Sequence, residues 1–349
     1  MSEHKANGGP GAALEDAARP AGPGAETYDV VMPVLKRDWP AAARGLPLVL
    51  QNLPLRRLVV VSGPDLLPLL PRDARIVFQD ENALCPGLTL AAVKAAIYRR
   101  IYTDKRAGWY FQQFLKLAYA RVCEGAAYIT WDADTIPLRP IPYRNEAGQY
   151  LFTLKDEYHT PYFDTIRTLF GIEKQRPESF IAENMIFDAA LVRGMLDELE
   201  ADPALEGGAF WERIINAIAQ EQLAGTGFSE FETFGSYVTA RHPGRYAVRR
   251  LATLRSGKNI LGEAPTPEML AWAGQSYDTV SIEKFNASTP LVLLAKSPAY
   301  RARHTAAQLE AHKQGYKIIP AVYGWGRSLW PRFKAWGGKY KRMLRRMRG

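Results

Sequence analysis

The stretch YITWDADTIPLRP, residues 128–140, places two aspartates one residue apart directly after a short run of apolar and β-branched residues. Such a run is typical of a strand covered on both faces, as in the parallel sheet of an α/β protein. An open α/β sheet binds its ligands at the carboxyl ends of its strands. Because residues i and i+2 of an extended segment point the same way, we expect Asp132 and Asp134 to face one ligand.

The two carboxylates repel each other unless a cation lies between them. Mg²⁺ and Mn²⁺ prefer oxygen ligands, and they also bind the phosphate oxygens of a substrate. The alternative is a turn in which one aspartate forms a local hydrogen bond and the other is solvated, which is common before Thr and Pro. The pattern therefore predicts a divalent-cation site at Asp132 and Asp134, with a simple turn as the alternative.

Strand and helix signals alternate around this stretch. Runs rich in Val and Ile predict further buried strands over residues 28–35, 57–63 and 74–80, and a helical period runs through residues 91–103 and 108–125. This alternation predicts an α/β fold.

Length and composition fit one large domain with a full core, since 47% of the 349 residues are hydrophobic. No apolar stretch of about 18 residues and no signal-peptide pattern is present, so we expect a cytoplasmic protein without a membrane span. Residues 1–26 are rich in Gly, Ala and Pro and predict a disordered leader. Cys85 and Cys123 are too few for a disulfide framework.

The net charge of +9 is concentrated at the carboxyl end of the chain. Residues 327–348 hold nine Lys or Arg and no acidic residue, and aromatic residues lie between them. Such a tail suits an anionic membrane surface and predicts peripheral binding at the inner face of the plasma membrane. A nucleic acid is the less favoured partner, and a solvated extension without a partner is the alternative.

The predicted helix over 108–121 carries polar residues among aromatic ones. Gln112 and Lys116 are four residues apart and share one face, with Gln113 beside them. A lysine next to a diphosphate would neutralise the charge that develops on the leaving group. The alternative is an ordinary solvated face, although two consecutive glutamines between aromatic residues are unusual there.

The segment FSEFETFGSYV, residues 228–238, places Glu230 and Glu232 among phenylalanines. Apolar surroundings raise the pKa of a carboxylate, so either glutamate is a candidate general base for an acceptor hydroxyl. The alternative for Glu232 is a capping box with Ser229, which matches the S-x-x-E spacing. Glu230 is therefore the preferred candidate.

The loop DEYHTPYFD, residues 156–164, combines His159 with aromatic rings. Tyr158, Tyr162 and Phe163 offer platforms on which a sugar ring can stack. We expect His159 and Tyr162 to line the acceptor side of the site.

Four segments in this order resemble a known family: GWYFQQFLKL, WDADTIPLRP, ENMIFD and SEFETFGSYV. The first two resemble the nucleotide-sugar domain of GT-A-type glycosyltransferases, whose D-x-D aspartates hold the metal of a metal–diphosphate sugar donor. The whole set is similar to bacterial glycosyltransferase-like proteins described as domain of unknown function 6492, from about Tyr28 to about Leu254. The resemblance implies a GT-A-like α/β domain over residues 27–300, a mixed sheet with helices on both faces, followed by a helix and tail over 301–349.

The resemblance also implies roles for residues at the strand ends. Asp134 would be the direct metal ligand, and Asp132 a contact to the metal or to the ribose of the donor. The rim of the nucleotide site would include residues after the first and third strands, namely Pro33, Lys36, Asp38 and Asp80. Asp38 has the alternative of capping the helix that starts near Pro40.

Two polar residues before the apolar segment MIF are candidates for acceptor binding. In GT-A enzymes the loop ahead of such a segment meets the acceptor, so the resemblance implies that Glu183 and Asn184 bind a sugar hydroxyl. The alternative is a plain strand boundary, where Asn and Glu are common.

The resulting expectation is a glycosyltransferase that uses Mn²⁺ or Mg²⁺ and a nucleoside-diphosphate sugar. Its acceptor would be a hydroxyl of a glycan or lipid-linked sugar, in synthesis of a cell-surface polysaccharide or glycolipid. The alternatives are a catalytically idle nucleotide- or glycan-binding protein and a metal-dependent phosphohydrolase, although phosphohydrolases usually cluster more Asp and His residues.

Overall fold

The computed structural model describes residues 26–312. The expected leader up to residue 25 and the basic tail lie outside the described residues. The chain forms two compact units, the first comprising residues up to 135 and 140–251, the second comprising residues 136–139 and those from 252 onward. The division after Leu251 differs from the expected end of the main body near residue 300.

The first unit is built around a five-stranded sheet in the order β3-β2-β1-β4-β7. The first four strands run parallel and β7 runs antiparallel to β4, so the sheet is mixed. The strands are β1 (Tyr28–Pro33), β2 (Leu55–Ser62), β3 (Ile76–Asp80), β4 (Ala127–Trp131) and β7 (Asn184–Asp188). β3 and β7 are the two edge strands; β3 is only partly buried, whereas β7 is fully buried.

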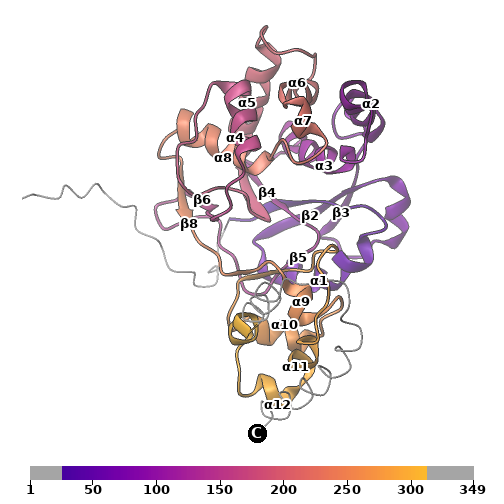
Figure 1. Ribbon diagram of the computed structural model, residues 1–349, viewed down its shortest axis with the longest axis vertical. Coiled ribbons are helices and arrows are strands. Elements are labelled where there is room, and N and C mark those ends of the chain that lie inside the picture. The colour runs from indigo at the N-terminus through magenta and orange to yellow at the C-terminus, as the bar shows by residue number, and fades with distance from the viewer. Residues whose placement is uncertain (1–25, 313–349) are drawn as a thin grey trace, which may run out of the picture. The chain divides into compact units, whose positions relative to one another are not determined.

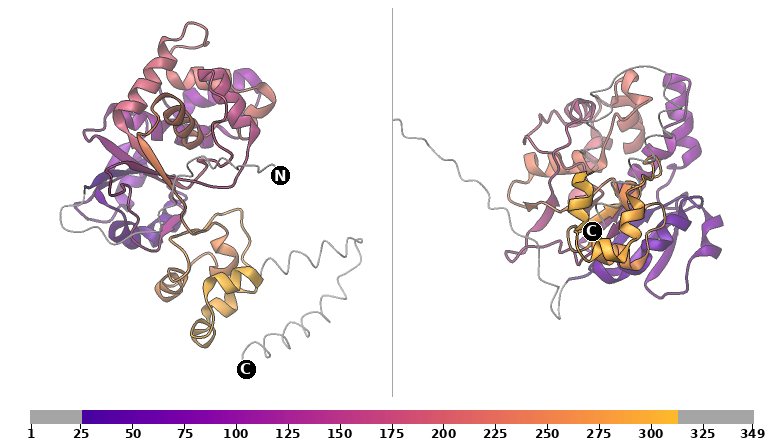
Figure 2. Two further views of the ribbon diagram at one scale, coloured as in Figure 1. Left: turned by 90° about the vertical axis from the view of Figure 1, so that its left-hand side faces the viewer. Right: turned by 60° about the horizontal axis from the view of Figure 1, so that its bottom comes forward.

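Helices cover both faces of this sheet, and alternate residues of its strands point to opposite faces. Val30 and Met32 pack with α1 (Trp39–Asn52) on one face. Val31 points to the other face and joins a larger core that includes residues of α2, α3, α4, α5, α6 and α8. Figure 1 shows this group of helices together on one side of the strands, and the left view of Figure 2 shows the same separation. The predicted mixed α/β sheet with helices on both faces is therefore confirmed.

The first unit also contains a small second sheet and the helices named above. A two-stranded parallel sheet pairs β6 with β8. The bounds are α2 (Leu90–Ile101), α3 (Ala107–Ala118), β6 (Tyr150–Thr153), α4 (Thr160–Phe170), α5 (Ala189–Ala201), α6 (Phe210–Ala217), α7 (Gln220–Leu223), α8 (Glu230–Arg241) and β8 (Tyr246–Arg249), with short 3₁₀ turns at Pro64–Leu69 and Tyr119–Arg121.

The second unit is a small helical body with a three-stranded sheet in the order β5-β10-β9. Asp278 holds the inserted segment to it, since its carbonyl accepts from the Leu138 amide at 2.7 Å and its carboxylate pairs with Arg139 at 3.0 Å. The elements are β5 (Thr135–Pro137), β9 (Thr253–Leu254), α9 (Gly257–Leu261), α10 (Pro267–Ala273), β10 (Thr279–Ser281), α11 (Val292–Lys296) and α12 (Pro298–Arg301). Between residues 26 and 312, no helix is long and apolar enough to cross a membrane.

Candidate functional site

The two aspartates lie in a turn that follows β4. The strand ends at Trp131, and the Thr135 amide donates to the Asp132 carbonyl at 3.0 Å, which closes a four-residue turn. The Trp131 indole fixes the turn by donating to the Thr135 carbonyl at 2.7 Å. The segment after Trp131 is therefore a turn and not extended as predicted. That both carboxylates face one ligand stays a prediction. The Asp132 side chain is 34% exposed, and Asp134 is exposed.

A buried lysine joins Asp132 to Glu230. The Lys116 ammonium lies 2.6 Å from Asp132 Oδ1 and 2.6 Å from Glu230 Oε1. Lys116 and Glu230 are each only 3% exposed. We call these three residues the Lys116 cluster. It brings together three residues that the sequence predicted as site residues, from three separate segments of the chain.

The Lys116 cluster shifts the protonation of its members. Burial alone would lower the pKa of the Lys116 ammonium, but Asp132 and Glu230 outweigh it and raise that pKa above its ordinary range. Burial also raises the pKa of Glu230, although Lys116 opposes the shift. Lys116 is thus a permanent cation that neutralises much of the negative charge at the end of β4.

The lysine changes the electrostatic argument for a metal. From the sequence, we expected a bound cation to offset the repulsion between Asp132 and Asp134. In the structure, Lys116 already offsets the charge of Asp132. Among residues 26–312 no group of three or more His, Cys, Asp or Glu side chains is arranged to hold a metal. Mg²⁺ is often bound by one or two carboxylates together with substrate phosphates. The donor set of Asp132 and Asp134 therefore fits an ion shared with a phosphate-bearing substrate, and not a cage made of protein alone.

The helix α3 is buried on more sides than its polar residues suggest. Gln113 is 2% exposed, and its side-chain oxygen accepts from the Glu230 amide at 3.1 Å while its amide donates to the Trp109 carbonyl at 3.2 Å. Gln112 is half-buried. Gln113 therefore ties α3 to the start of α8, and Lys116 faces two carboxylates inside the protein instead of an open surface.

Glu232 lies in different surroundings. It is fully buried, and its carboxylate accepts from the Phe180 amide at 2.6 Å and pairs with Lys174 at 3.1 Å. We call Glu232, Lys174 and the Phe180 amide the Glu232 cluster. Ser229 caps α8 by accepting from the Glu232 amide at 3.3 Å, so the cap is confirmed, but the glutamate side chain turns to Phe180 and does not complete a capping box. These contacts give Glu232 a structural role.

Residues at the start of β7 lie next to the end of β4. Asn184 pairs with Trp131 across the sheet, and the Glu183 carbonyl accepts from the Asp132 amide at 3.0 Å. Asn184 is 1% exposed and accepts from the Tyr143 hydroxyl at 2.7 Å, so its side chain is inside the protein and does not face an acceptor. The Glu183 carboxylate pairs with Lys155 at 3.0 Å. Lys155 was missed in the sequence because nothing there pairs it with a residue 28 positions away.

The acceptor-side loop is fixed by His159. Its Nε2 lies 2.7 Å from the Thr226 carbonyl and 2.8 Å from the Thr226 hydroxyl. Tyr162 and Phe163 are buried, whereas Tyr158 is 65% exposed and packs edge-on against Phe163 with ring centroids 4.7 Å apart. Tyr162 is therefore not a stacking platform, and of the three rings only Tyr158 offers a face to solvent.

The predicted nucleotide rim lies along the carboxyl ends of the first three strands. Pro33 pairs with Val61, and Ser62 pairs with Asp80, so these ends are neighbours. Asp80 accepts from the Asn82 amide at 2.9 Å and shapes the turn after β3. Lys36 is exposed and forms a 3.4 Å pair with Asp65 from the loop after β2.

Asp38 lies at the cap position of α1, but no side-chain hydrogen bond caps that helix. The capping alternative for its carboxylate is therefore wrong, and its place on the nucleotide rim stays a prediction. The helix nonetheless starts with a proline at its second position, as the sequence pattern indicated.

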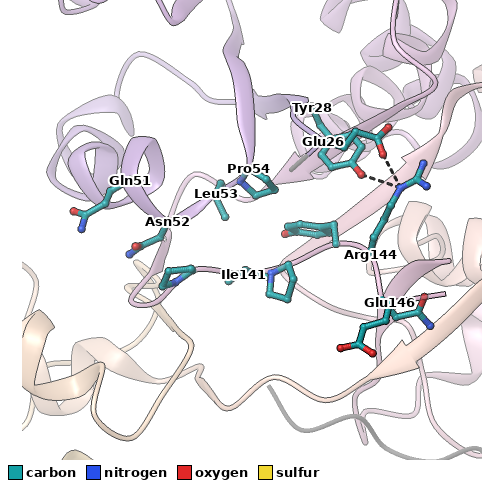
Figure 3. Close-up of a pocket in the computed structure, with 13 residues that line it drawn as sticks. Glu26, Tyr28, Gln51, Asn52, Leu53, Pro54, Ile141, Arg144 and Glu146 are labelled. Carbon is teal, nitrogen blue, oxygen red and sulfur yellow. Dashed lines mark hydrogen bonds and ion pairs between the residues drawn. The ribbon is translucent and has the colours of Figure 1, made fainter. Parts of the chain in front are cut away.

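One cavity lies away from this edge of the sheet. A hollow of about 490 Å³ is lined by Tyr28, Leu53 and Pro54, at the edge where β1 and β2 begin, and by residues 140–146. Figure 3 shows Arg144 beside Glu26 and Tyr28 at its rim. Because ligands of open α/β sheets bind at the carboxyl ends of the strands, this hollow is separate from the candidate site.

Residues 71–276 match a family described as a family of unknown function, DUF6492, which confirms the resemblance to that family. No curated protein matches the chain. Among solved structures the chain is similar to the apo form of mouse xyloside xylosyltransferase 1, with 14% identity, coverage of 76% of this chain and 100% of that chain, and a TM-score of 0.42. It is also similar to the apo WbbM bifunctional glycosyltransferase, with 12% identity, coverage of 84% and 53%, and a TM-score of 0.42. The chain thus spans about half the length of that second protein.

Proposed function

The chain belongs to the DUF6492 family, a family of unknown function, and we propose that it is a glycosyltransferase of the GT-A type. It transfers a sugar from a nucleoside diphosphate to a hydroxyl group of a glycan or a lipid-linked acceptor. The observation that carries the proposal is the Lys116 cluster, which holds the half-exposed Asp132 at the carboxyl edge of the sheet. This is the edge at which α/β sheets bind nucleotides.

The nucleotide would lie along the ends of β1, β2 and β3. Lys36 and Asp80 are within reach of water there and supply a cation and a hydrogen-bond acceptor. Pro33 ends β1, which leaves this edge without an amide donor at that position.

Asp132 and Asp134 would hold Mg²⁺ or Mn²⁺ together with the diphosphate of the donor, and the ion supplies positive charge against the departing nucleoside diphosphate. The contribution of the protein is to position Asp132. Lys116 fixes its carboxylate at one oxygen, and Glu230 fixes Lys116 in turn. A carboxylate held in advance in this way loses little conformational freedom when the donor binds.

Glu230 is a positioning residue in this proposal. A general base must reach the acceptor hydroxyl, but Glu230 is 3% exposed and its Oε1 already accepts from Lys116. Burial argues against the direct contact that the sequence pattern predicted. Glu230 acts through Lys116 on Asp132.

The acceptor would meet the loop that carries Tyr158. Its ring is supported by Phe163, and the loop is fastened by the contacts of His159 with Thr226, four residues before Glu230. An exposed tyrosine on a fixed loop is a suitable platform for a sugar ring. A cytoplasmic location, with the tail of residues 327–349 bound to the inner membrane surface, is retained as part of the proposal.

The experiment is calorimetry with UDP, GDP and CMP, each with and without Mn²⁺, followed by incubation with the nucleotide sugars that carry the nucleotide found to bind. We expect one nucleotide to bind more tightly with Mn²⁺, and its nucleotide sugar to be hydrolysed slowly without an acceptor. Asp132→Asn should abolish the effect of Mn²⁺. Absence of binding by all three nucleotides to the folded protein would refute the proposal, and binding without hydrolysis would indicate an idle family member.

A further inference from the structure

We propose that the corner between α2 and α3, formed by residues 94–109, is a docking surface for an anionic lipid bilayer. The corner includes exposed aromatic rings, a concentration of basic side chains and a strained backbone position, and neither the core nor the Lys116 cluster uses them. It is independent of the tail, which lies outside the described residues.

The outer face of α2 is exposed along its whole length. Val93, Ala96 and Ile97 face the core, whereas Ala91, Lys94, Ala95 and Tyr98 are exposed on the opposite side, as is Tyr102 directly after the helix. Tyr98 is 55% and Tyr102 is 79% exposed, and their rings meet edge-on with centroids 6.1 Å apart. The helix thus presents two large rings to the surroundings, next to small residues that leave them accessible.

Tyr102 has an unusual backbone conformation. It caps the carboxyl end of α2 with φ +54°, the left-handed region, and it is the one residue other than glycine with positive φ between residues 26 and 312. Glycine is the usual residue at such a cap, because a side chain costs about 1 kcal/mol there. A strained tyrosine that is almost fully exposed adds little to the core, so its ring is more simply explained by a partner.

Positive charge surrounds these rings. Between residues 94 and 106 the chain has five Lys or Arg and one acidic residue, Asp104, which pairs with Lys94 at 3.5 Å. Arg99 and Lys105 are exposed, and neither forms an ion pair within the described part of the chain. Arg106 lies over the Trp109 ring, 4.5 Å from its centroid. The corner is therefore a cationic and aromatic surface.

This combination matches the interface of an anionic membrane. Tyrosine and tryptophan favour the headgroup level, and each Lys or Arg near an anionic surface strengthens binding about fivefold. A nucleic acid would use the same charges, but it provides no apolar layer for two exposed tyrosines on one helix face. The corner includes the first residues of α3, and Lys116 lies about 10 Å further along this helix. Docking at the corner would therefore bring the candidate site near lipid-linked molecules.

The test measures cosedimentation of the full chain with two vesicle types, phosphatidylcholine alone and equal parts phosphatidylcholine and phosphatidylglycerol. The tail is common to all variants, so differences between variants report on the corner. Arg99→Glu with Lys105→Glu should weaken binding to the anionic vesicles at least about tenfold. The control is the same charge change at two exposed arginines elsewhere, Arg72→Glu with Arg303→Glu, which should weaken it clearly less.

Tyr102→Gly separates a docking role from a structural one. Glycine relieves the positive φ, so the urea midpoint of the variant should be equal to or higher than that of the wild type. Its binding to anionic vesicles should nevertheless fall several-fold. Equal binding by the wild type, Tyr102→Gly and the Arg99→Glu/Lys105→Glu variant would overturn the proposal. The proposal would also be overturned if these substitutions weakened binding of the protein to a DNA duplex but not to the anionic vesicles.

Discussion

Glu230 and Glu232 lie in the first turn of the same helix, α8, and both are buried. Each pairs with one lysine, yet their surroundings differ. Glu230 reaches Lys116, which also holds Asp132, a carboxylate 34% exposed at the end of β4. Glu232 reaches Lys174 and the Phe180 amide, which hold a loop against α8. Burial and a lysine partner are common to both glutamates, so the proposed role of Glu230 rests on what its lysine contacts next, the partly exposed Asp132.

Lys116→Met should have the largest effect on stability. It leaves Glu230 buried without a cation and Asp132 with one contact fewer, and breaking a buried ion pair from one side costs about 3–5 kcal/mol. The matched control is Lys174→Met, after which Glu232 keeps its bond from the Phe180 amide. Its cost should be about 1–3 kcal/mol. Urea unfolding measures both, and a larger loss for Lys174→Met would contradict the comparison.

Glu230→Gln should lower the rate of sugar-nucleotide hydrolysis at least tenfold, about 1.4 kcal/mol of the barrier. The reason is that a neutral amide holds Lys116 less firmly, so Asp132 is less well placed. Glu232→Gln, measured at a temperature where it remains folded, should change the rate less than twofold. Steady-state kinetics with the nucleotide sugar that the protein binds measure this, and equal losses in both variants would remove the distinction.

The pH dependence of stability provides a smaller effect. Burial raises the pKa of Glu230 in the folded state, so folding binds a proton there and this contribution is present at low pH. It is lost as the pH rises above the ordinary glutamate range through the raised pKa. The free energy of unfolding of the wild type relative to Glu230→Gln should therefore decrease with rising pH in that window. Urea titrations across the window test this, and an increase would be inconsistent with the raised pKa.

The strands and the cap of α8 were predictable from local sequence. The apolar runs that predict β1, β2 and β4 need only neighbouring residues, and Ser229 precedes its helix at the correct spacing. The turn at Asp132 was open as an alternative because D-x-D fits both conformations.

The pairings that make the site were not predictable in the same way. Lys116 and Glu230 are 114 residues apart, and nothing local places a lysine in the interior. The sequence pattern predicted that Asn184 binds the acceptor, because nothing local indicates its partner, the Tyr143 hydroxyl, which lies 41 residues earlier in the chain.

The most direct test of the central claim is a double-mutant cycle between Glu230 and Asp132, read out as the affinity for the nucleotide in the presence of Mn²⁺. If Glu230 acts through Lys116 on Asp132, Glu230→Gln weakens binding in the wild type and has no further effect in the Asp132→Asn variant. If the two substitutions weaken binding additively, Glu230 does not act through Asp132, and the account of the site is contradicted.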